Sequence, residues 1–170
     1  MSFHQHVINE LDQNRKVFEA LLEDVPKEMI SWRDHPHRWS LLEIVCHLHD
    51  EEKEDFRARV RLALGDPSKG FVAIDPQGWV KERKYAEQDY DLMLFKFLKQ
   101  RKISIEWLSS LKNPAWENYT VHKSLGAMSA ELFLSNWLAH DLLHFRQIVK
   151  LKFDYLKSVS DQDLSYAGVW

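Results

Sequence analysis

The sequence predicts an all-α protein built as a four-helix bundle, and two observations support this fold class. Four long segments of the 170-residue chain repeat apolar residues at helical spacing, whereas alternation with a period of two is almost absent. Four amphipathic helices of about 20 residues bury their apolar stripes most simply against one another. Because the chain shows neither an internal repeat nor a separating linker, we expect one domain over residues 1–170.

The first two predicted helices follow from an apolar stripe and a capping motif. Residues 3–23 carry the first stripe, formed by Phe3, Val7, Leu11, Phe18, Leu21 and Leu22. Pro26 and the segment 35–37 then mark a connection. The second helix begins at Ser40, because Ser40-Leu41-Leu42-Glu43 is a capping box, and it continues to just before Gly65.

The connection after the second helix, residues 65–85, is unusually long. Structureless loops rarely exceed about 12–15 residues, so we expect this segment to pack over the bundle or to line a site. A connection of this length can also cross the bundle, so spacing alone leaves the order of the helix directions open.

The third and fourth predicted helices complete the bundle. The third spans residues 89–111 and ends before Asn113-Pro114, since a residue that precedes proline avoids helical geometry. A loop follows that carries Trp116, Tyr119, His122 and Gly126. The fourth helix begins near Ser129 and runs to about Lys157.

Charge and cysteine content exclude several classes of function. The chain has 23 Lys and Arg against 26 Asp and Glu, a net charge of −3, which provides no basic surface for nucleic acid or an anionic membrane. Its single cysteine, Cys46, excludes an intramolecular disulfide and a cysteine-rich zinc site. No signal peptide and no uncharged apolar stretch of about 18 residues is present, so we expect a cytoplasmic protein without a membrane partner.

The strongest indication of chemistry lies on the fourth predicted helix. One narrow arc of this helix contains Phe133, Trp137, His140, His144, Ile148 and Leu151. The rings of His140 and His144 therefore lie one turn apart on the buried face, close enough to bind one ion. A buried imidazole without partners is costly, and a metal ion satisfies one nitrogen of each ring. The alternative is an ordinary pair of core histidines, and spacing alone leaves both interpretations open.

A third ligand would come from a neighbouring helix, and His47 and His49 on the second helix are the candidates. Residues two apart point about 200° away from each other, so only one of them can face the site. Spacing favours His47 weakly. Glu43 lies one turn before it and Asp50 and Glu51 one turn after it, so these carboxylates are candidates for orienting a ligand or moving a proton.

The remaining histidines have simpler explanations. We interpret His4 and His6 as solvated, His35 and His37 as loop residues, and His122 as a residue that could reach the mouth of the bundle. Cys46 is interpreted as an inert buried thiol.

Two short motifs resemble the DinB/YfiT-like family. The first is Trp39-Ser40-x-x-Glu43-x-x-x-His47-Leu48-x-Asp50-x-Glu52, and the second is His140-Asp141-x-x-His144-x-x-Gln147-Ile148. The resemblance covers nearly the whole chain, including the long connection. It implies an up-down-down-up bundle, frequent homodimers, and a divalent metal held at one end of the bundle by His47, His140 and His144. Arg146 departs from the family pattern, because many members carry glycine there; its larger side chain could alter packing or dimer contacts.

The resemblance implies several possible activities: thiol-dependent transfer with bacillithiol or mycothiol, maleylpyruvate isomerisation, and metal-dependent hydrolysis. The leading prediction is an enzyme with a three-histidine site that acts on a small molecule, either as a hydrolase or as an S-transferase that uses a low-molecular-weight thiol. Zn²⁺ is the favoured ion, while Ni²⁺, Fe²⁺ and Mn²⁺ also accept imidazole. The alternative is a non-catalytic bundle that binds metal or dimerises in a stress response.

Overall fold

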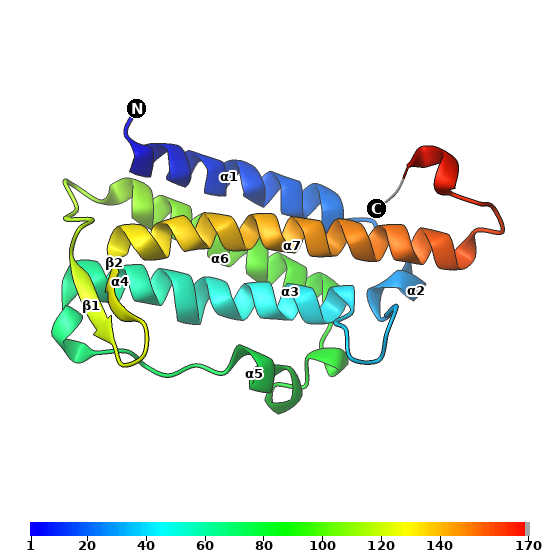
Figure 1. The fold of residues 1–170 in the computed structure, drawn as a ribbon, viewed down its shortest axis with the longest axis horizontal. Coiled ribbons are helices and arrows are strands. Elements are labelled where there is room, and N and C mark those ends of the chain that lie inside the picture. The colour runs from blue at the N-terminus through cyan, green and yellow to red at the C-terminus, as the bar shows by residue number, and fades with distance from the viewer. Residues whose placement is uncertain (169–170) are drawn as a thin grey trace.

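Four long helical segments lie side by side in the computed structural model, which describes residues 1–168 (Figure 1). They are α1 (Phe3–Leu22), α3 (Leu41–Asp50) continued by η1 (Glu51–Phe56) and α4 (Arg57–Gly65), α6 (Tyr90–Ser110) and α7 (Ala130–Val159). α1 and α7 run in one direction along the bundle, and the two segments between them run in the other. The four-helix bundle and its up-down-down-up order are therefore confirmed.

The helices begin where the sequence offers caps. At the start of α3, the backbone N–H of Ser40 donates to Glu43 Oε2 at 2.8 Å, and the Glu43 N–H donates back to Ser40 Oγ at 3.4 Å. The side chains of Ser2, Asp89 and Ser129 accept backbone hydrogen bonds at the starts of α1, α6 and α7. The predicted and observed ends of the long helices consequently differ by at most a few residues.

The second helical segment contains an irregularity that the sequence did not indicate. Glu51–Phe56 form a π-helix, η1, between α3 and α4. A π-helical turn is wider than an α-helical turn and changes the direction of every side chain that follows it. Glu51, Glu52 and Phe56 are buried in this stretch, although four of its six residues are acidic.

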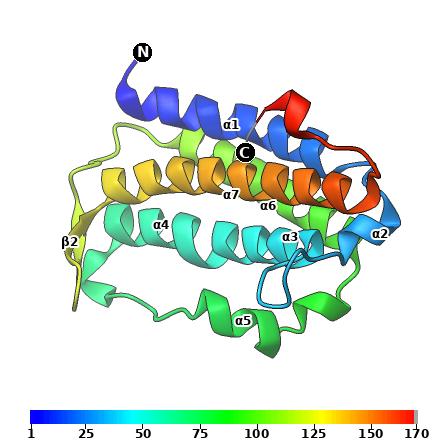
Figure 2. The same cartoon turned by 45° about the vertical axis from the view of Figure 1, so that its right-hand side comes forward.

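The connection between α4 and α6 packs along the outside of α3, as the two views in Figures 1 and 2 show. It contains the short helix α5 (Pro76–Glu82) and the 3₁₀ turns η2 (Pro67–Lys69) and η3 (Tyr85–Glu87). Trp79 and Tyr85 are buried from this segment and join the core around α3. The expectation that the long connection packs over the bundle is confirmed. A second short helix, α2 (Lys27–Ile30), lies between α1 and α3.

The segment before α7 is not a plain loop. It forms an antiparallel hairpin of β1 (Tyr119–His122) and β2 (Gly126–Ser129), in which His122 pairs with Gly126. Gly126 has φ = +76°, a conformation that suits glycine and closes the turn. The hairpin stands where the sequence predicted a loop, and it leaves the all-α fold class unchanged. Strands of four mostly exposed residues are too short to give a clear period of two.

Two apolar clusters fill the bundle, with a polar layer between them. The cluster at the hairpin end includes Leu11, Phe56 and Trp137, and the cluster at the opposite end includes Phe18, Ile44 and Ile148. Along α7, both histidines fall between Trp137 of one cluster and Ile148 of the other. The candidate site thus lies partway along the bundle, whereas the family resemblance implied a site at one end of the bundle. No helix within residues 1–168 combines the length and apolar character needed to cross a membrane.

Candidate metal centre

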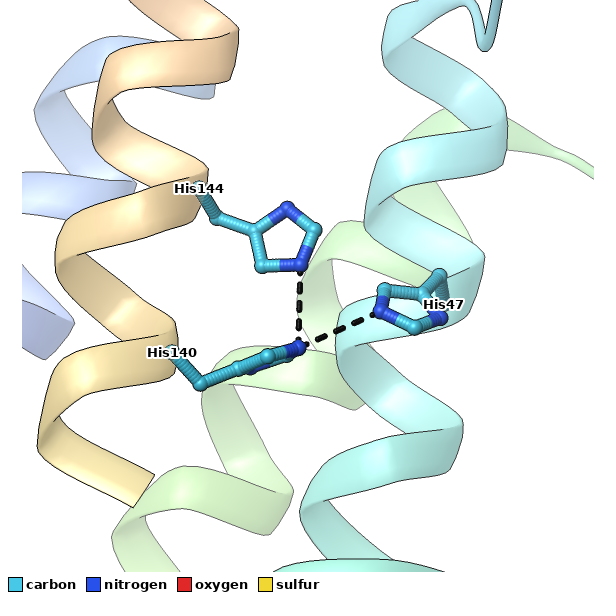
Figure 3. Close-up of side chains that lie close together, drawn as sticks. All are labelled: His47, His140 and His144. Atoms are coloured by element: carbon cyan, nitrogen blue, oxygen red, sulfur yellow. Dashed lines mark hydrogen bonds between the residues drawn. The ribbon is translucent and has the colours of Figure 1, made fainter. Parts of the chain in front are cut away.

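Three histidines from two helices turn their rings toward one another (Figure 3). His140 Nε2 lies 3.3 Å from His47 Nε2 and 3.0 Å from His144 Nε2. Ligand atoms from the three residues all lie within 4.8 Å of one another. The one-turn spacing brings the two histidines of α7 together, and the packing of α3 against α7 adds His47.

Hydrogen bonds alone do not satisfy this arrangement. A neutral imidazole nitrogen carries either one proton or one lone pair, so His140 Nε2 makes one well-directed hydrogen bond although two nitrogens lie within 3.3 Å. The buried Nδ1 atoms of His47 and His144 have no hydrogen-bond partner among residues 1–168. With metal–nitrogen bonds of about 2.0–2.1 Å, a tetrahedral zinc site places its nitrogens about 3.3–3.4 Å apart. The observed spacing therefore fits a divalent ion among the three rings.

Burial keeps all three imidazoles in the neutral form that ligates metals. Loss of hydration on burial, followed by the neighbouring His144, lowers the pKa of His47 to about 3 and that of His140 to about 2. Burial likewise lowers the pKa of His144 to about 4. At neutral pH the rings therefore present lone pairs rather than positive charges.

His49 does not take part in the cluster. Its Nδ1 contacts Asp50 Oδ1 at 2.8 Å, so this imidazole pairs with its own neighbour in the chain. Of the two candidates that spacing left open on the second helix, the structure brings His47 to the α7 pair.

Two of the three candidate carboxylates are engaged in holding the fold. Arg33 donates to both oxygens of Glu43, at 2.8 and 3.0 Å, in addition to the capping bonds of this residue. Asp50 accepts a hydrogen bond of 2.6 Å from the Tyr85 hydroxyl and forms an ion pair with Arg83 at 2.8 Å. Both oxygens of each carboxylate are therefore engaged by groups outside the three histidines.

Glu51, the third candidate, has different surroundings. It is buried one turn beyond His47, and its carboxyl group is hydrogen-bonded to Asp55. Burial, reinforced by the charge of Asp55, raises the pKa of Glu51 to about 8. Asp55 itself is held by Arg59, with Asp55 Oδ1 2.8 Å from Arg59 Nε. At neutral pH Glu51 therefore carries a proton, one helical turn after His47.

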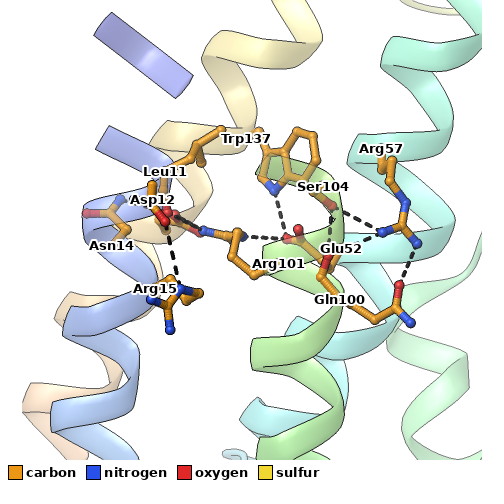
Figure 4. Close-up of polar contacts among 11 residues, drawn as sticks. Leu11, Asp12, Asn14, Arg15, Glu52, Arg57, Gln100, Arg101, Ser104 and Trp137 are labelled. Atoms are coloured by element: carbon orange, nitrogen blue, oxygen red, sulfur yellow. Dashed lines mark hydrogen bonds and ion pairs between the residues drawn. The ribbon is translucent and has the colours of Figure 1, made fainter. Parts of the chain in front are cut away.

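A buried ionic network fixes the two helices that carry the histidines (Figure 4). Arg101 of α6 donates to both oxygens of Asp141 at 2.6 and 2.7 Å, and to Glu52 Oε2 at 2.9 Å. The Trp137 indole also donates to Glu52 Oε2 at 2.9 Å, and Asn14 donates to Asp141 at 3.0 Å. Asp141 follows His140 on α7 and Glu52 follows α3, so one guanidinium ties together both sides of the site.

Sequence reasoning missed Arg101, although a signal for it exists. The buried face of α6 is formed by Tyr90, Met93, Leu94, Phe97, Arg101, Ser104 and Leu108. An arginine at a core position of an apolar stripe requires a carboxylate partner. Glu52 and Asp141 both stand in the two motifs, so the three residues could have been connected from the sequence.

A pocket of about 580 Å³ opens beside His140, between α4, α7 and the hairpin. Its lining includes Asp55, Arg59, His122, Asn136 and His140, together with apolar side chains from α7 and the hairpin. His122 thus lines the same pocket as His140.

His4 is a correction to the sequence interpretation. The structure places its ring 4.8 Å from the ring of Trp116 in a stacked arrangement, with Nε2 2.6 Å from Glu131. This histidine joins α1 to the start of α7 rather than being simply solvated. His6, His35 and His37 are exposed, as expected.

Comparisons with known proteins agree with the fold described above. A family model described as the DinB superfamily matches residues 10–148. The solved structure of YfiT from Bacillus subtilis, described as a probable metal-dependent hydrolase with an unusual four-helix bundle topology, superposes with a TM-score of 0.79 at 16% sequence identity. This match covers 91% of the present chain and 90% of the YfiT chain, and at that identity it speaks for the fold alone. A comparison with curated protein sequences gave no match.

Proposed function

Because this chain belongs to the DinB superfamily, we propose that it is a metal-dependent hydrolase that acts on a small molecule. The observation that carries the proposal is the convergence of three neutral imidazole nitrogens next to an open pocket. The description of YfiT, the structural relative, as a probable metal-dependent hydrolase supports the same reaction class.

His47, His140 and His144 would hold the ion through Nε2, and Zn²⁺ is the ion we propose. Three protein ligands plus one open position is the arrangement of catalytic zinc sites, and imidazole suits zinc well. When bound, such an ion supplies Lewis acidity, which lowers the pKa of water and polarises a carbonyl or phosphoryl oxygen.

The remaining chemistry falls to residues of the pocket. Glu51 holds a proton at neutral pH, and Asp55 is hydrogen-bonded to it and lines the pocket that His140 also lines. This carboxyl pair can accept a proton from an attacking water and return it to a leaving group. The apolar side chains of the pocket exclude water from the bound substrate and orient it.

The first test is the metal content of protein purified without a nickel column. We expect one zinc ion per chain by mass spectrometry, and we expect His144→Ala to lose it, since two nitrogens bind far more weakly than three. His6→Ala, which changes an exposed histidine of α1, serves as the matched control and should keep its metal. Equal metal content in His144→Ala and His6→Ala would contradict the site.

The second test separates hydrolysis from the thiol chemistry expected from the family resemblance. The zinc-loaded chain is incubated with a panel of esters and amides, and in parallel with bacillithiol and electrophiles. Hydrolysis that disappears in His144→Ala supports the proposal. Metal-dependent consumption of the thiol without hydrolysis would indicate an S-transferase instead of a hydrolase. The absence of any metal-dependent reaction would favour the non-catalytic bundle.

A further inference from the structure

The pocket beside His140 is part of a longer groove along α7. It shares Leu143 with a second pocket, which is lined by His144. The second pocket shares Arg38, Gln147 and Lys150 with a third pocket that reaches Asp154. We call these three neighbouring pockets the groove. They follow one another along α7 from Leu132 to Asp154, and His140 lines the first pocket and His144 the second.

The half of the groove near the hairpin is predominantly apolar. Its apolar lining includes Phe71, Leu125, Met128, Leu132, Phe133 and Leu143. Leu125 and Leu132 are 67% and 40% exposed, so their side chains are available to a ligand. The stretch of α7 from Leu132 to Leu143 is about 16 Å long at 1.5 Å per residue, enough for an extended hydrocarbon chain.

The other half of the groove carries an excess of positive charge beside His144. Arg38 is paired with Asp34 at 2.6 Å, and Lys150 is paired with Asp154 at 2.5 Å. Arg146 is exposed, and the structure gives it no ion pair or hydrogen bond within residues 1–168. Its guanidinium is thus the cation of this half that no carboxylate compensates, and guanidinium groups bind carboxylate and phosphate groups well.

We propose that the substrate is an amphipathic anion. Its apolar body lies in the hairpin half of the groove, its carboxylate or phosphate group lies at Arg146, and the bond to be cut lies between them at the three histidines. This inference rests on the proposed function and adds the class of substrate to it. Arg146 acts as a specificity-determining residue.

Binding of simple amphiphiles to the zinc-loaded full-length chain tests this proposal by isothermal titration calorimetry. Octanoate and octyl phosphate are compared with octylammonium, which has the opposite charge, and with butanoate, which lacks most of the apolar chain. We expect at least one of the two long anions to bind at least tenfold more tightly than octylammonium and butanoate. The preferred anion then identifies the head group.

Two variants with matched controls connect the binding to the groove. Arg146→Ala should weaken the binding of the long anion about tenfold. Lys157→Ala, which removes the same charge from α7 outside the groove, should leave this binding unchanged. Leu132→Asn should weaken the binding of the long anion but not that of butanoate, whereas Leu92→Asn on α6 should leave both affinities unchanged. An effect of Arg146→Ala no larger than that of Lys157→Ala, or equal binding of octylammonium, would overturn the proposal.

Metal content and ester hydrolysis are measured on the same samples, so that the two proposals fail separately. Protein that binds the anion through Arg146 but hydrolyses nothing counts against the hydrolase. Protein that hydrolyses esters in a metal-dependent manner but binds none of the amphiphiles counts against the amphipathic substrate.

Discussion

At the scale of single residues, His140 is the most informative position, because its Nε2 faces both other imidazoles. We expect zinc to raise the melting temperature of the wild-type chain and to leave the melting temperature of His140→Ala unchanged. An ion present at 100 times its dissociation constant stabilises the folded state by about 2.7 kcal/mol. Thermal melts with and without zinc measure this. A zinc-dependent shift of equal size in His140→Ala would contradict the role of this ring, and His6→Ala should behave as the wild type.

Glu51 gives a prediction about pH. Its pKa is about 8 in the folded chain and near 4.5 in the unfolded chain, so between these values the folded state holds a proton that the unfolded state has lost. Stability contributed by this group is therefore full below about pH 4.5 and declines up to about pH 8, by at most about 1.4 kcal/mol per pH unit. Glu51→Gln, which cannot ionise, should gain stability relative to the wild type as the pH rises.

Urea denaturation at several pH values between 5 and 8, with a chelator present, measures this difference. Metal binding has its own pH dependence, which the chelator removes. Glu106→Gln, an exposed change on α6, provides the control and should follow the wild type at every pH. A constant difference between Glu51→Gln and the wild type would show that Glu51 titrates normally.

The candidate site was predictable at this scale only in part. Spacing placed His140 and His144 on one face, because helical periodicity is a local property. It favoured His47 over His49 only weakly, since that choice depends on the rotation of α3 against α7. The engagement of Glu43 and Asp50 by Arg33, Tyr85 and Arg83 depends on tertiary contacts that no local pattern reports.

At the scale of elements, the network around Arg101 joins α6 to the helices that bear the histidines. Replacing this side chain by methionine leaves Glu52 and Asp141 as buried, uncompensated carboxylates, which typically costs about 3–5 kcal/mol. We expect Arg101→Met to lower the free energy of unfolding by this amount in urea denaturation. Lys102→Met, an exposed change one residue away, should be close to neutral.

A milder variant keeps this prediction testable if Arg101→Met does not fold. Arg101→Lys retains the positive charge but cannot make the paired hydrogen bonds to Asp141. Its free energy of unfolding should therefore lie between those of the wild type and Arg101→Met. A variant Arg101→Lys as stable as the wild type would indicate that charge alone, and not the geometry of the guanidinium, holds the network.

The long helices could be predicted from the sequence because their caps and stripes are local. The π-helix η1 could not, since no local pattern in Glu51–Phe56 indicates it, and its buried Glu52 is held by the distant residues Arg101 and Trp137. The hairpin could not be predicted either. Its strands are short and mostly exposed, so their sequence shows no periodicity. Their position depends on tertiary contacts, such as the hydrogen bond from the Thr120 hydroxyl to the Pro67 carbonyl.

At the scale of the whole molecule, the homodimer implied by the family resemblance stays a prediction. Leu142, Val149 and Leu156 are exposed at seven-residue intervals on α7, the spacing of helices that pack against each other. Light scattering should give twice the 20.3 kDa mass of the chain. Val149→Glu should halve that mass, and Val17→Glu on the exposed side of α1 should not. A wild-type chain that is monomeric in solution would contradict the predicted dimer.

We predict that one divalent ion binds between the two apolar clusters of the bundle, held by His47, His140 and His144. The most direct measurement is an anomalous difference map at the zinc edge from crystals of the zinc-loaded chain. We predict one peak about 2.0–2.1 Å from Nε2 of each of the three histidines, with one further position open toward the groove. A zinc peak at other residues, or a zinc-loaded crystal without a peak at this cluster, would contradict the account.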